Sequence, residues 1–137
     1  MPNIYNLFKF LEKKKGTETP LKFKLIYAPE EVTDEDLNVE GDLDLPYTNI
    51  TSLPDNLKVR GFLDLTNTKK ITSLPDNLQV GGHIFSNSSN LTSLPDNLSI
   101  GGDFWLQKTP LAGKYTKEEI RKMIEGKGGY VKGRIYV

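Results

Sequence analysis

The string TSLPDNL occurs three times without a change, at residues 51–57, 72–78 and 92–98. Its prolines, Pro54, Pro75 and Pro95, lie 21 and then 20 residues apart, a period typical of proteins built from short stacked repeats. A coil of about 20 residues cannot bury its own apolar edge, so it must stack on copies of itself. The repeated string therefore predicts a solenoid.

Each copy is followed by a segment in which apolar residues alternate with other residues. After the first copy these apolar residues include Val59, Leu63 and Leu65. A period of two predicts a strand with one buried face, and stacked coils would pair such strands into a parallel sheet. Related segments without the string begin at Leu37 and end at Val137, so we expect about five coils.

The string itself predicts a corner of the coil. Its proline lacks an N–H group and belongs on the return path, and the Asp-Asn pair that follows suits a tight turn. A glycine also recurs at one position of each copy, as Gly61, Gly82 and Gly102. Such a glycine is expected where φ is positive or where neighbouring coils approach too closely for a Cβ atom.

These motifs resemble the short leucine-rich repeats of bacterial and bacteriophage proteins, in which LxxLPxxL alternates with an LxLxxN/TxL strand segment. The resemblance covers about 100 of the 137 residues. It implies an α/β repeat fold, a leucine-rich-repeat solenoid with a parallel β-sheet, and it suggests a bacteriophage origin with the protein acting in the host cytoplasm.

The chain departs from that family pattern at two kinds of position. Where the common motif has an asparagine that bonds the backbone, this chain has a hydroxyl residue, and a hydroxyl can make a similar bond; these residues are Thr48, Thr68, Ser89 and Thr109. Ser86 also replaces an apolar strand residue, which leaves the packing of that coil open.

Both ends of the repeat predict caps within one structural domain. We assign residues 1–36 to an N-terminal cap, 37–111 to the leucine-rich repeats and 112–137 to a C-terminal cap. The N-terminal cap is expected to contain a helix over residues 3–15 and an edge strand over residues 21–27. Thr116 and Glu119 predict a capping box that opens a C-terminal helix inserted before the last strand.

Composition excludes several classes of function. Without cysteine the chain has no disulfide and no thiolate metal site, and we expect no cofactor. Its 18 basic and 18 acidic side chains balance, which argues against nucleic acid as a partner although basic clusters with interleaved tyrosines occur near both ends. No run of about 18 apolar residues is present, so we expect no membrane span and a cytoplasmic location.

Residues between the inward leucines should form rows on the opposite face of the strands. One row contains Asp44, Asp64, Phe85, Trp105 and Tyr136, and its neighbour contains Asp42, Phe62, His83, Asp103 and Arg134. Trp and Tyr dominate protein interfaces, and acidic residues beside them favour a partner with a basic rim. We therefore predict a non-enzymatic module that binds a protein through its concave strand face, although aromatic side chains in a row can also simply pack on one another. The predicted binding residues are Phe62, Phe85, Trp105, Tyr136, Asp44, Asp64, His83, Asp103, Gln107 and Arg134.

The sequence supports two other functions less well than protein binding. Catalysis has little support, because His83 is the single histidine and the sequence contains neither a Ser-His-Asp set nor a metal-ligand spacing. Asp44 and Asp64 would lie on adjacent strands, but pairs of like charges on adjacent strands are common on solvated faces. The alternative is a structural subunit that self-associates end to end, for example in a virion, because basic and acidic residues cluster in different parts of the chain.

Overall fold

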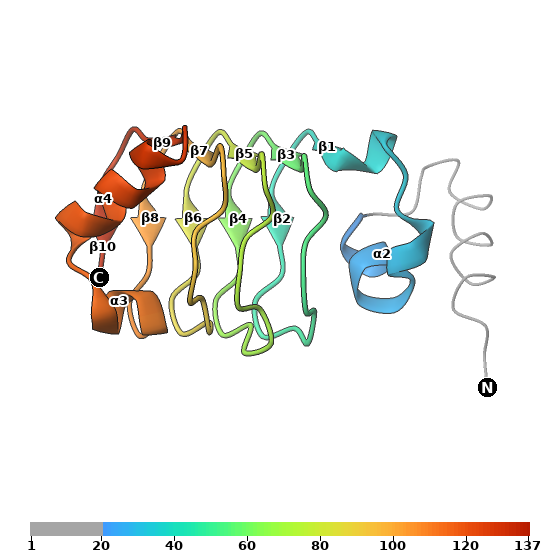
Figure 1. Cartoon of the computed structure of the whole chain (residues 1–137). Helices are drawn as coiled ribbons and strands as arrows, with labels where there is room; N and C mark the ends of the chain where they lie inside the picture. Colours follow the sequence, from blue (N-terminus) through green and yellow to red (C-terminus); the bar gives the residue numbers. More distant parts are fainter. Residues whose placement is uncertain (1–20) are drawn as a thin grey trace.

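The chain folds into a solenoid of parallel strands, seen from the side in Figure 1. The computed structural model describes residues 21–137, so the helix expected over residues 3–15 lies outside the described part. Within these described residues, two sheets run along the solenoid, and each contains five strands. The odd-strand sheet contains β1 (Asn38–Val39), β3 (Lys58–Val59), β5 (Gln79–Val80), β7 (Ser99–Ile100) and β9 (Tyr130–Val131). The even-strand sheet contains β2 (Leu43–Asp44), β4 (Leu63–Asp64), β6 (Ile84–Phe85), β8 (Phe104–Trp105) and β10 (Ile135–Tyr136).

Each coil thus contributes two short strands, whereas the alternation over residues 59–65 predicts one. The chain bends at residues 60–61, between β3 and β4. Because the period of two continues through the bend, Val59 and Leu63 are both buried on either side of it. The parallel repeat solenoid is confirmed, but the prediction of a single sheet is wrong.

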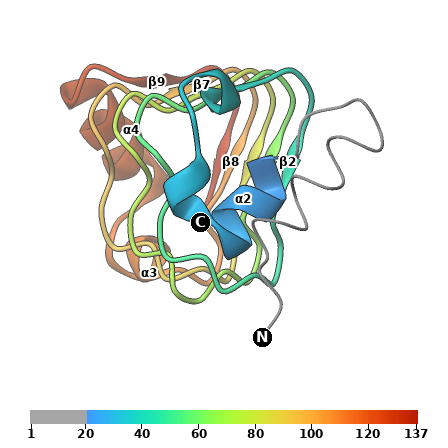
Figure 2. The same cartoon turned by 90° about the vertical axis from the view of Figure 1, so that its right-hand side faces the viewer.

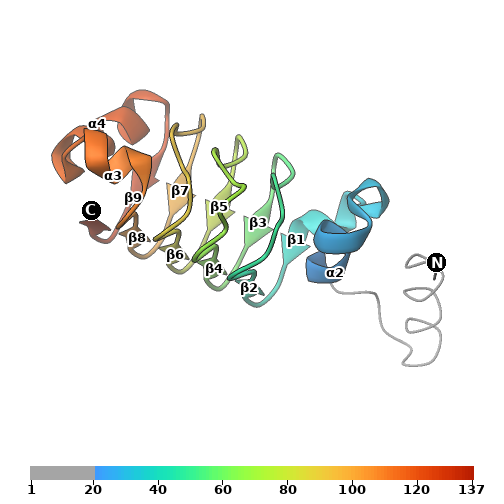
Figure 3. The ribbon, with the colours of Figure 1, turned by 90° about the horizontal axis from the view of Figure 1, so that it is seen from below.

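The solenoid has about three full turns of β-structure, so the expectation of five coils is also too high. Three return segments contain TSLPDNL and close a turn without a helix. The fourth return path consists of the helices α3 (Pro110–Lys114) and α4 (Lys117–Gly126) instead of a further TSLPDNL segment. Figure 3 shows the row of turns with helices at both ends.

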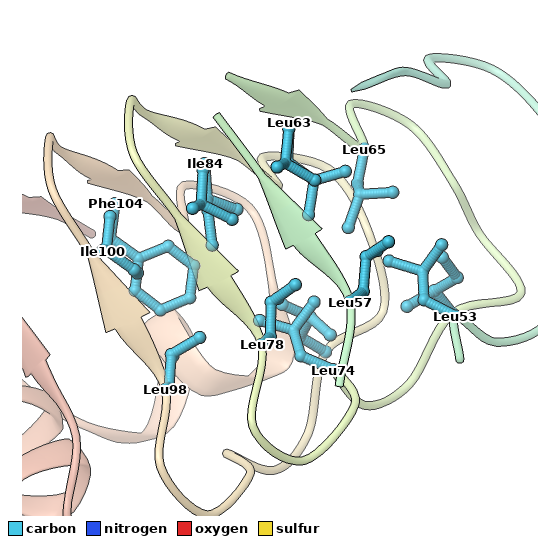
Figure 4. Close-up of a cluster of buried hydrophobic side chains, with 14 of the residues drawn as sticks. Leu53, Leu57, Leu63, Leu65, Leu74, Leu78, Ile84, Leu98, Ile100 and Phe104 are labelled. Atoms are coloured by element: carbon cyan, nitrogen blue, oxygen red, sulfur yellow. The ribbon is translucent and has the colours of Figure 1, made fainter. Parts of the chain in front are cut away.

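The core consists of columns of apolar side chains that repeat from coil to coil. Leu63, Ile84 and Phe104 point inward from successive even strands and are fully buried (Figure 4). Leu57, Leu78 and Leu98 form a second column at the ends of the TSLPDNL segments. Full burial of one such side chain stabilises the fold by roughly 1.5–3 kcal/mol. The apolar repeat positions are therefore confirmed as the core.

The TSLPDNL segments stack as a corner, which we call the proline corner (residues 51–57, 72–78 and 92–98). Asn56, Asn77 and Asn97 have φ of 67°, 62° and 56°, a region that asparagine tolerates better than most residues. The Asn77 side-chain amide donates to Asn56 Oδ1 at 2.8 Å, and that of Asn97 donates to Asn77 Oδ1 at 2.9 Å. The predicted tight turn is confirmed.

Aspartates form a parallel ladder at the same corner. Asp55 Oδ1 accepts from the Asp76 N–H at 3.0 Å, and Asp76 Oδ1 accepts from the Asp96 N–H at 3.0 Å. Each bond joins the same residue of two neighbouring coils. These two ladders require the same residue at the same place in the three copies, and this explains why the Asp-Asn pair of the string does not change. The last leucine of each copy is fixed by its full burial in the core.

The recurring glycine lies at the opposite corner, which we call the glycine corner (residues 40–42, 60–62, 81–83, 101–103 and 132–134). A Cβ atom on Gly102 would lie 2.6 Å from His83 Nδ1 and 2.9 Å from the carbonyl carbon of Gly82. At Gly41, which no earlier coil covers, a Cβ atom would meet no atom within 4 Å. Among the glycines of residues 21–137 only Gly128 has positive φ, so close approach of the coils, rather than φ, explains the glycine corner.

Hydroxyl groups satisfy backbone carbonyls inside the coils, as the sequence predicts. Each donates to the carbonyl three residues earlier, over 2.6–2.9 Å; the donors are Thr48, Thr68, Ser89 and Thr109. Ser86, which replaces an apolar strand residue, is fully buried, and its hydroxyl donates to the Trp105 carbonyl at 2.7 Å. It thereby replaces an apolar contact with a bond between coils.

The described part of the N-terminal cap contains the helix α2 (Leu21–Tyr27), so the prediction of an edge strand over residues 21–27 is wrong. Leu21 and Leu25 fit a strand period of two, but they are also four residues apart and lie on one face of a helix. Both are buried and belong to the core cluster. Figure 2 shows α2 across the end of the coils, followed by the 3₁₀-helices η1 (Pro29–Glu31) and η2 (Glu35–Leu37).

An ion pair ties α2 to η2, since Lys24 Nζ lies 2.9 Å from Asp36 Oδ2. Burial alone would raise the pKa of the Asp36 carboxyl. The Thr33 N–H and hydroxyl and the Lys24 ammonium bind the ionised form, and together they hold that pKa below its ordinary value of 3.8.

The C-terminal helix begins where the sequence predicts. Thr116 accepts from the Glu119 N–H at 3.1 Å while the Glu119 carboxylate accepts from the Thr116 N–H at 3.0 Å, which confirms the capping box of α4. Ile120 and Ile124 of α4 are buried. The shorter helix α3, capped by Thr109, was not expected.

Candidate interaction surface

The predicted row of variable residues lies in register on the outer face of the even-strand sheet. Asp44 pairs with Asp64, Asp64 with Phe85, Phe85 with Trp105 and Trp105 with Tyr136. This follows from the alternation of the strands, because the neighbouring leucines point inward. The structure thus brings these five residues together as predicted.

Four aromatic side chains form a continuous surface that we call the aromatic stripe (Phe62, Phe85, Trp105 and Tyr136). The rings of Phe62 and Phe85 meet edge to face with centroids 5.8 Å apart. Trp105 stacks between the other two, at 6.1 Å from Phe85 and 4.0 Å from Tyr136. Such pairs stabilise by about 0.5–1.5 kcal/mol beyond their burial. The rings therefore hold one another in place.

Trp105 is the central residue of the stripe and is only partly buried. Its indole Nε1 is covered and has no hydrogen-bond partner among residues 21–137. An indole N–H without an acceptor gives up the hydrogen bond it would make with water. Stacking, rather than a hydrogen bond, therefore fixes this side chain.

The acidic end of the row is less covered than the aromatic end. Asp44 is exposed, and Asp64 accepts from the Thr66 N–H at 2.9 Å in a local turn. The pair lies on adjacent strands, one step before the aromatic residues. The surface thus changes from anionic to aromatic along the axis of the solenoid.

The second predicted row follows the glycine corner, and its polar members bond the backbone of the next coil. Asp42 Oδ1 accepts from the Phe62 N–H, and His83 Nδ1 accepts from the Asp103 N–H, both at 2.9 Å. Asp103 Oδ1 accepts from the Arg134 N–H at 2.7 Å. His83 and Asp103 therefore have a role in stacking that the sequence did not indicate.

The remaining predicted residues lie at the margin of this surface. The side chains of Arg134 and Gln107 are exposed, and the Gln107 carbonyl accepts from the Ser88 N–H. Within residues 21–137 no cluster of three or more histidine or acidic residues is suited to hold a metal ion. In the same part of the chain, no helix is long and apolar enough to cross a bilayer.

One charged residue that sequence reasoning missed closes the end of the solenoid. The guanidinium of Arg121, on α4, donates to the carbonyls of Val131 and Gly133 at 2.6 and 2.8 Å. A groove of about 590 Å³ lies beside it, between α4 and β10. No sequence signal marks this role, because the two acceptors are ten and twelve residues away.

No protein-family model matches this chain, and neither a curated protein nor a solved structure is significantly similar to it.

Proposed function

We propose that the chain is a short protein of the leucine-rich-repeat type whose task is to bind another protein without catalysis. The observation that carries this proposal is the aromatic stripe, which lies on the outer face of a sheet instead of in the core. Aromatic side chains that are held in place contribute binding area at a small cost in conformational entropy. Trp105 and Phe85 would be the anchors, with Phe62 and Tyr136 beside them.

The charged residues at the margin would orient the partner. Asp44 and Asp64 lie at one end of the stripe, and Arg134 lies near the other. Complementary charges at the rim of an interface increase the rate and the specificity of association more than the affinity. The proposed partner therefore has an apolar centre and a basic patch that faces the two aspartates.

The test replaces Trp105 with aspartate. This row already carries aspartate at Asp44 and Asp64, so the strand accommodates that residue. A matched control is Gln79→Asp, which is exposed on the outer face of the odd-strand sheet. In affinity capture from lysate of the native cells, we expect one protein to be retained by wild type and Gln79→Asp and lost with Trp105→Asp.

A third variant separates binding from folding. Trp105→Phe keeps a stacked ring and removes an N–H that has no acceptor among residues 21–137, so we expect it to fold with wild-type stability and to retain the partner. Circular dichroism of all variants checks the fold. Capture of the same proteins by wild type and by a folded Trp105→Asp variant would refute the stripe as the binding surface.

Self-association is the second candidate, favoured by the distribution of charge. Acidic residues occupy the N-terminal end of the solenoid, including Glu30, Glu31 and Asp34, whereas the C-terminal end carries Lys117, Lys122 and Arg134. Copies attracted end to end would dissociate in about 1 M salt, where the Debye length is about 3 Å. Light scattering at low and high salt tests this, and a monomer at both would exclude it.

A further inference from the structure

The even-strand sheet has an open edge at β10. Along the edge that faces β8, two carbonyls at β10 accept hydrogen bonds from the neighbouring coil. The Arg134 carbonyl accepts from the Phe104 N–H, and the Tyr136 carbonyl accepts from the Leu106 N–H, both at 2.8 Å. In a planar trans peptide the N–H points opposite to the carbonyl. The N–H groups of Ile135 and Val137 therefore point away from the sheet, where they can serve as a template for a further strand.

The matching edge of the odd-strand sheet is closed. Arg121 donates to the outward carbonyls of Val131 and Gly133, in place of the N–H groups that another coil would supply. The same helix, α4, contacts both β9 and β10. It thus blocks one edge and leaves a groove at the other.

The groove beside β10 has room for an extended chain. Its volume is about 590 Å³, within the range of ligand sites. A second hollow of about 500 Å³ continues it past Val137 toward α3. In Figure 1, β10 lies between α4 and α3 at this end of the molecule. Ile135 and Tyr136 line both hollows, so the two form a path along the edge of the strand.

Charge indicates which chain would fit. The groove is lined by four cationic residues and two carboxylates, namely Lys117, Arg121, Lys122, Arg134, Glu118 and Glu125. Within residues 21–137, Lys117, Lys122 and Arg134 form no ion pair. These three side chains are exposed at the rim and are free to meet carboxylates.

We propose that the edge of β10 binds an extended acidic peptide, which adds a strand to the even-strand sheet and directs its carboxylates to Lys117, Lys122 and Arg134. In strand addition the main chain supplies affinity and alternate side chains supply specificity. A separate polypeptide fits better than a second copy of this chain, because the acidic residues of segment 30–36 lie largely in the 3₁₀-helices η1 and η2. This binding does not depend on the aromatic stripe having a partner.

The first experiment uses the full chain and a fluorescent peptide of sequence Glu-Val-Glu-Val-Glu-Val, with Kd measured by anisotropy. We expect the double variant Lys122→Glu/Arg134→Glu to weaken binding about tenfold or more, since like charges then face each other. The matched control is Lys58→Glu/Lys70→Glu, which reverses two exposed lysines elsewhere and should leave Kd within about twofold. Equal loss in both variants, or no binding by wild type, would overturn the proposal.

The second experiment tests strand addition itself. Val137→Pro removes an outward N–H and no bond to the neighbouring coil, so the fold should persist while Kd rises about threefold or more. N-methylation of the peptide at alternate residues should raise the Kd for wild-type protein by a similar factor. If Val137→Pro binds the peptide as tightly as wild type does, and the N-methylated peptide binds as tightly as the unmodified one, the contact is electrostatic alone and the proposed strand addition is wrong.

Discussion

The proline corner and the glycine corner use the same kind of hydrogen bond under different sequence constraints. In both, a side-chain acceptor on one coil receives an N–H of the next. At the proline corner the acceptor is always aspartate, as in Asp55 and Asp76. At the glycine corner the acceptor changes from coil to coil and is Asp42, His83 or Asp103. Phe62 occupies the same position in its coil, but its phenyl ring cannot accept such a bond from the His83 N–H.

The difference shows what allows neighbouring coils to pack closely at each corner. At the proline corner one residue of each coil must adopt positive φ and also bond the same residue of the next coil through its side-chain amide. Both roles are filled by asparagine, at Asn56, Asn77 and Asn97. At the glycine corner the absence of a Cβ atom already allows the coils to approach. The next side chain is then free to vary, so one row of residues can contribute both to stacking and to recognition.

The largest effect is expected at the glycine corner. Gly102→Ala places a Cβ atom against His83 Nδ1 and the Gly82 carbonyl carbon, and overpacking of this kind costs about 2–3 kcal/mol. Gly41→Ala, at the same repeat position with open space around it, should change the free energy of unfolding by no more than about 0.5 kcal/mol. Urea denaturation measures both, and equal losses would contradict the role given to close approach.

A smaller effect is expected at the proline corner. Asp76→Ala leaves the Asp96 N–H without its acceptor and should lower the free energy of unfolding by about 1–2 kcal/mol. The control is Asp96→Ala, because the Asp96 carboxylate accepts no N–H among residues 21–137 and lies 4.0 Å from Lys127 Nζ. We expect a loss of about 0.5 kcal/mol there. If Asp96→Ala cost as much as Asp76→Ala, the ladder would not be the source of stability.

His83 allows the two corners to be compared directly. His83→Ala removes the acceptor of the Asp103 N–H and should cost about 1 kcal/mol. His83→Asn restores an acceptor at that corner, so its stability is expected to lie within about 0.5 kcal/mol of wild type. Thermal unfolding distinguishes the two variants. A wild-type melting temperature for His83→Ala would show that this bond does not hold the coils together.

The smallest effect is expected for a carboxylate whose partners all lie in the N-terminal cap. Asp36 accepts from the Thr33 N–H, and its pKa in the folded chain is lowered. Its contribution is therefore present at neutral pH and is lost as the pH falls below its ordinary value of 3.8. Wild type should lose about 0.5 kcal/mol more than Asp36→Asn between about pH 7 and pH 3. Identical pH dependence of the two unfolding curves would contradict this assignment.

The register of the fold could be predicted from the sequence, but its bends could not. TSLPDNL fixes how the coils align, because each copy marks the same corner. The bend at residues 60–61 leaves no trace in the pattern, since Val59 and Leu63 are buried whether or not the chain turns between them. Leu21 and Leu25 fit the period of a strand and of a helix equally, and packing against the first coil decides in favour of α2.

The candidate surface was predictable to the same extent. Alternation places Phe85, Trp105 and Tyr136 in one row, and the structure has them in contact. The backbone bonds of His83 and Asp103 depend on the bend, so the pattern could not reveal them. Arg121 closes the odd-strand sheet through carbonyls that only the folded chain brings near it.

The identical proline corners also determine how the chain can change in length. Removal of residues 79–98 would join Leu78 to Ser99, so that one corner leads into a later coil in the same phase. Because each repeat contacts only its neighbours, such a deletion leaves both caps in place and sets Trp105 beside Asp64. In-frame loss or duplication of one period therefore exchanges a whole rung of the outer surface in a single genetic event, with no point mutation in the core.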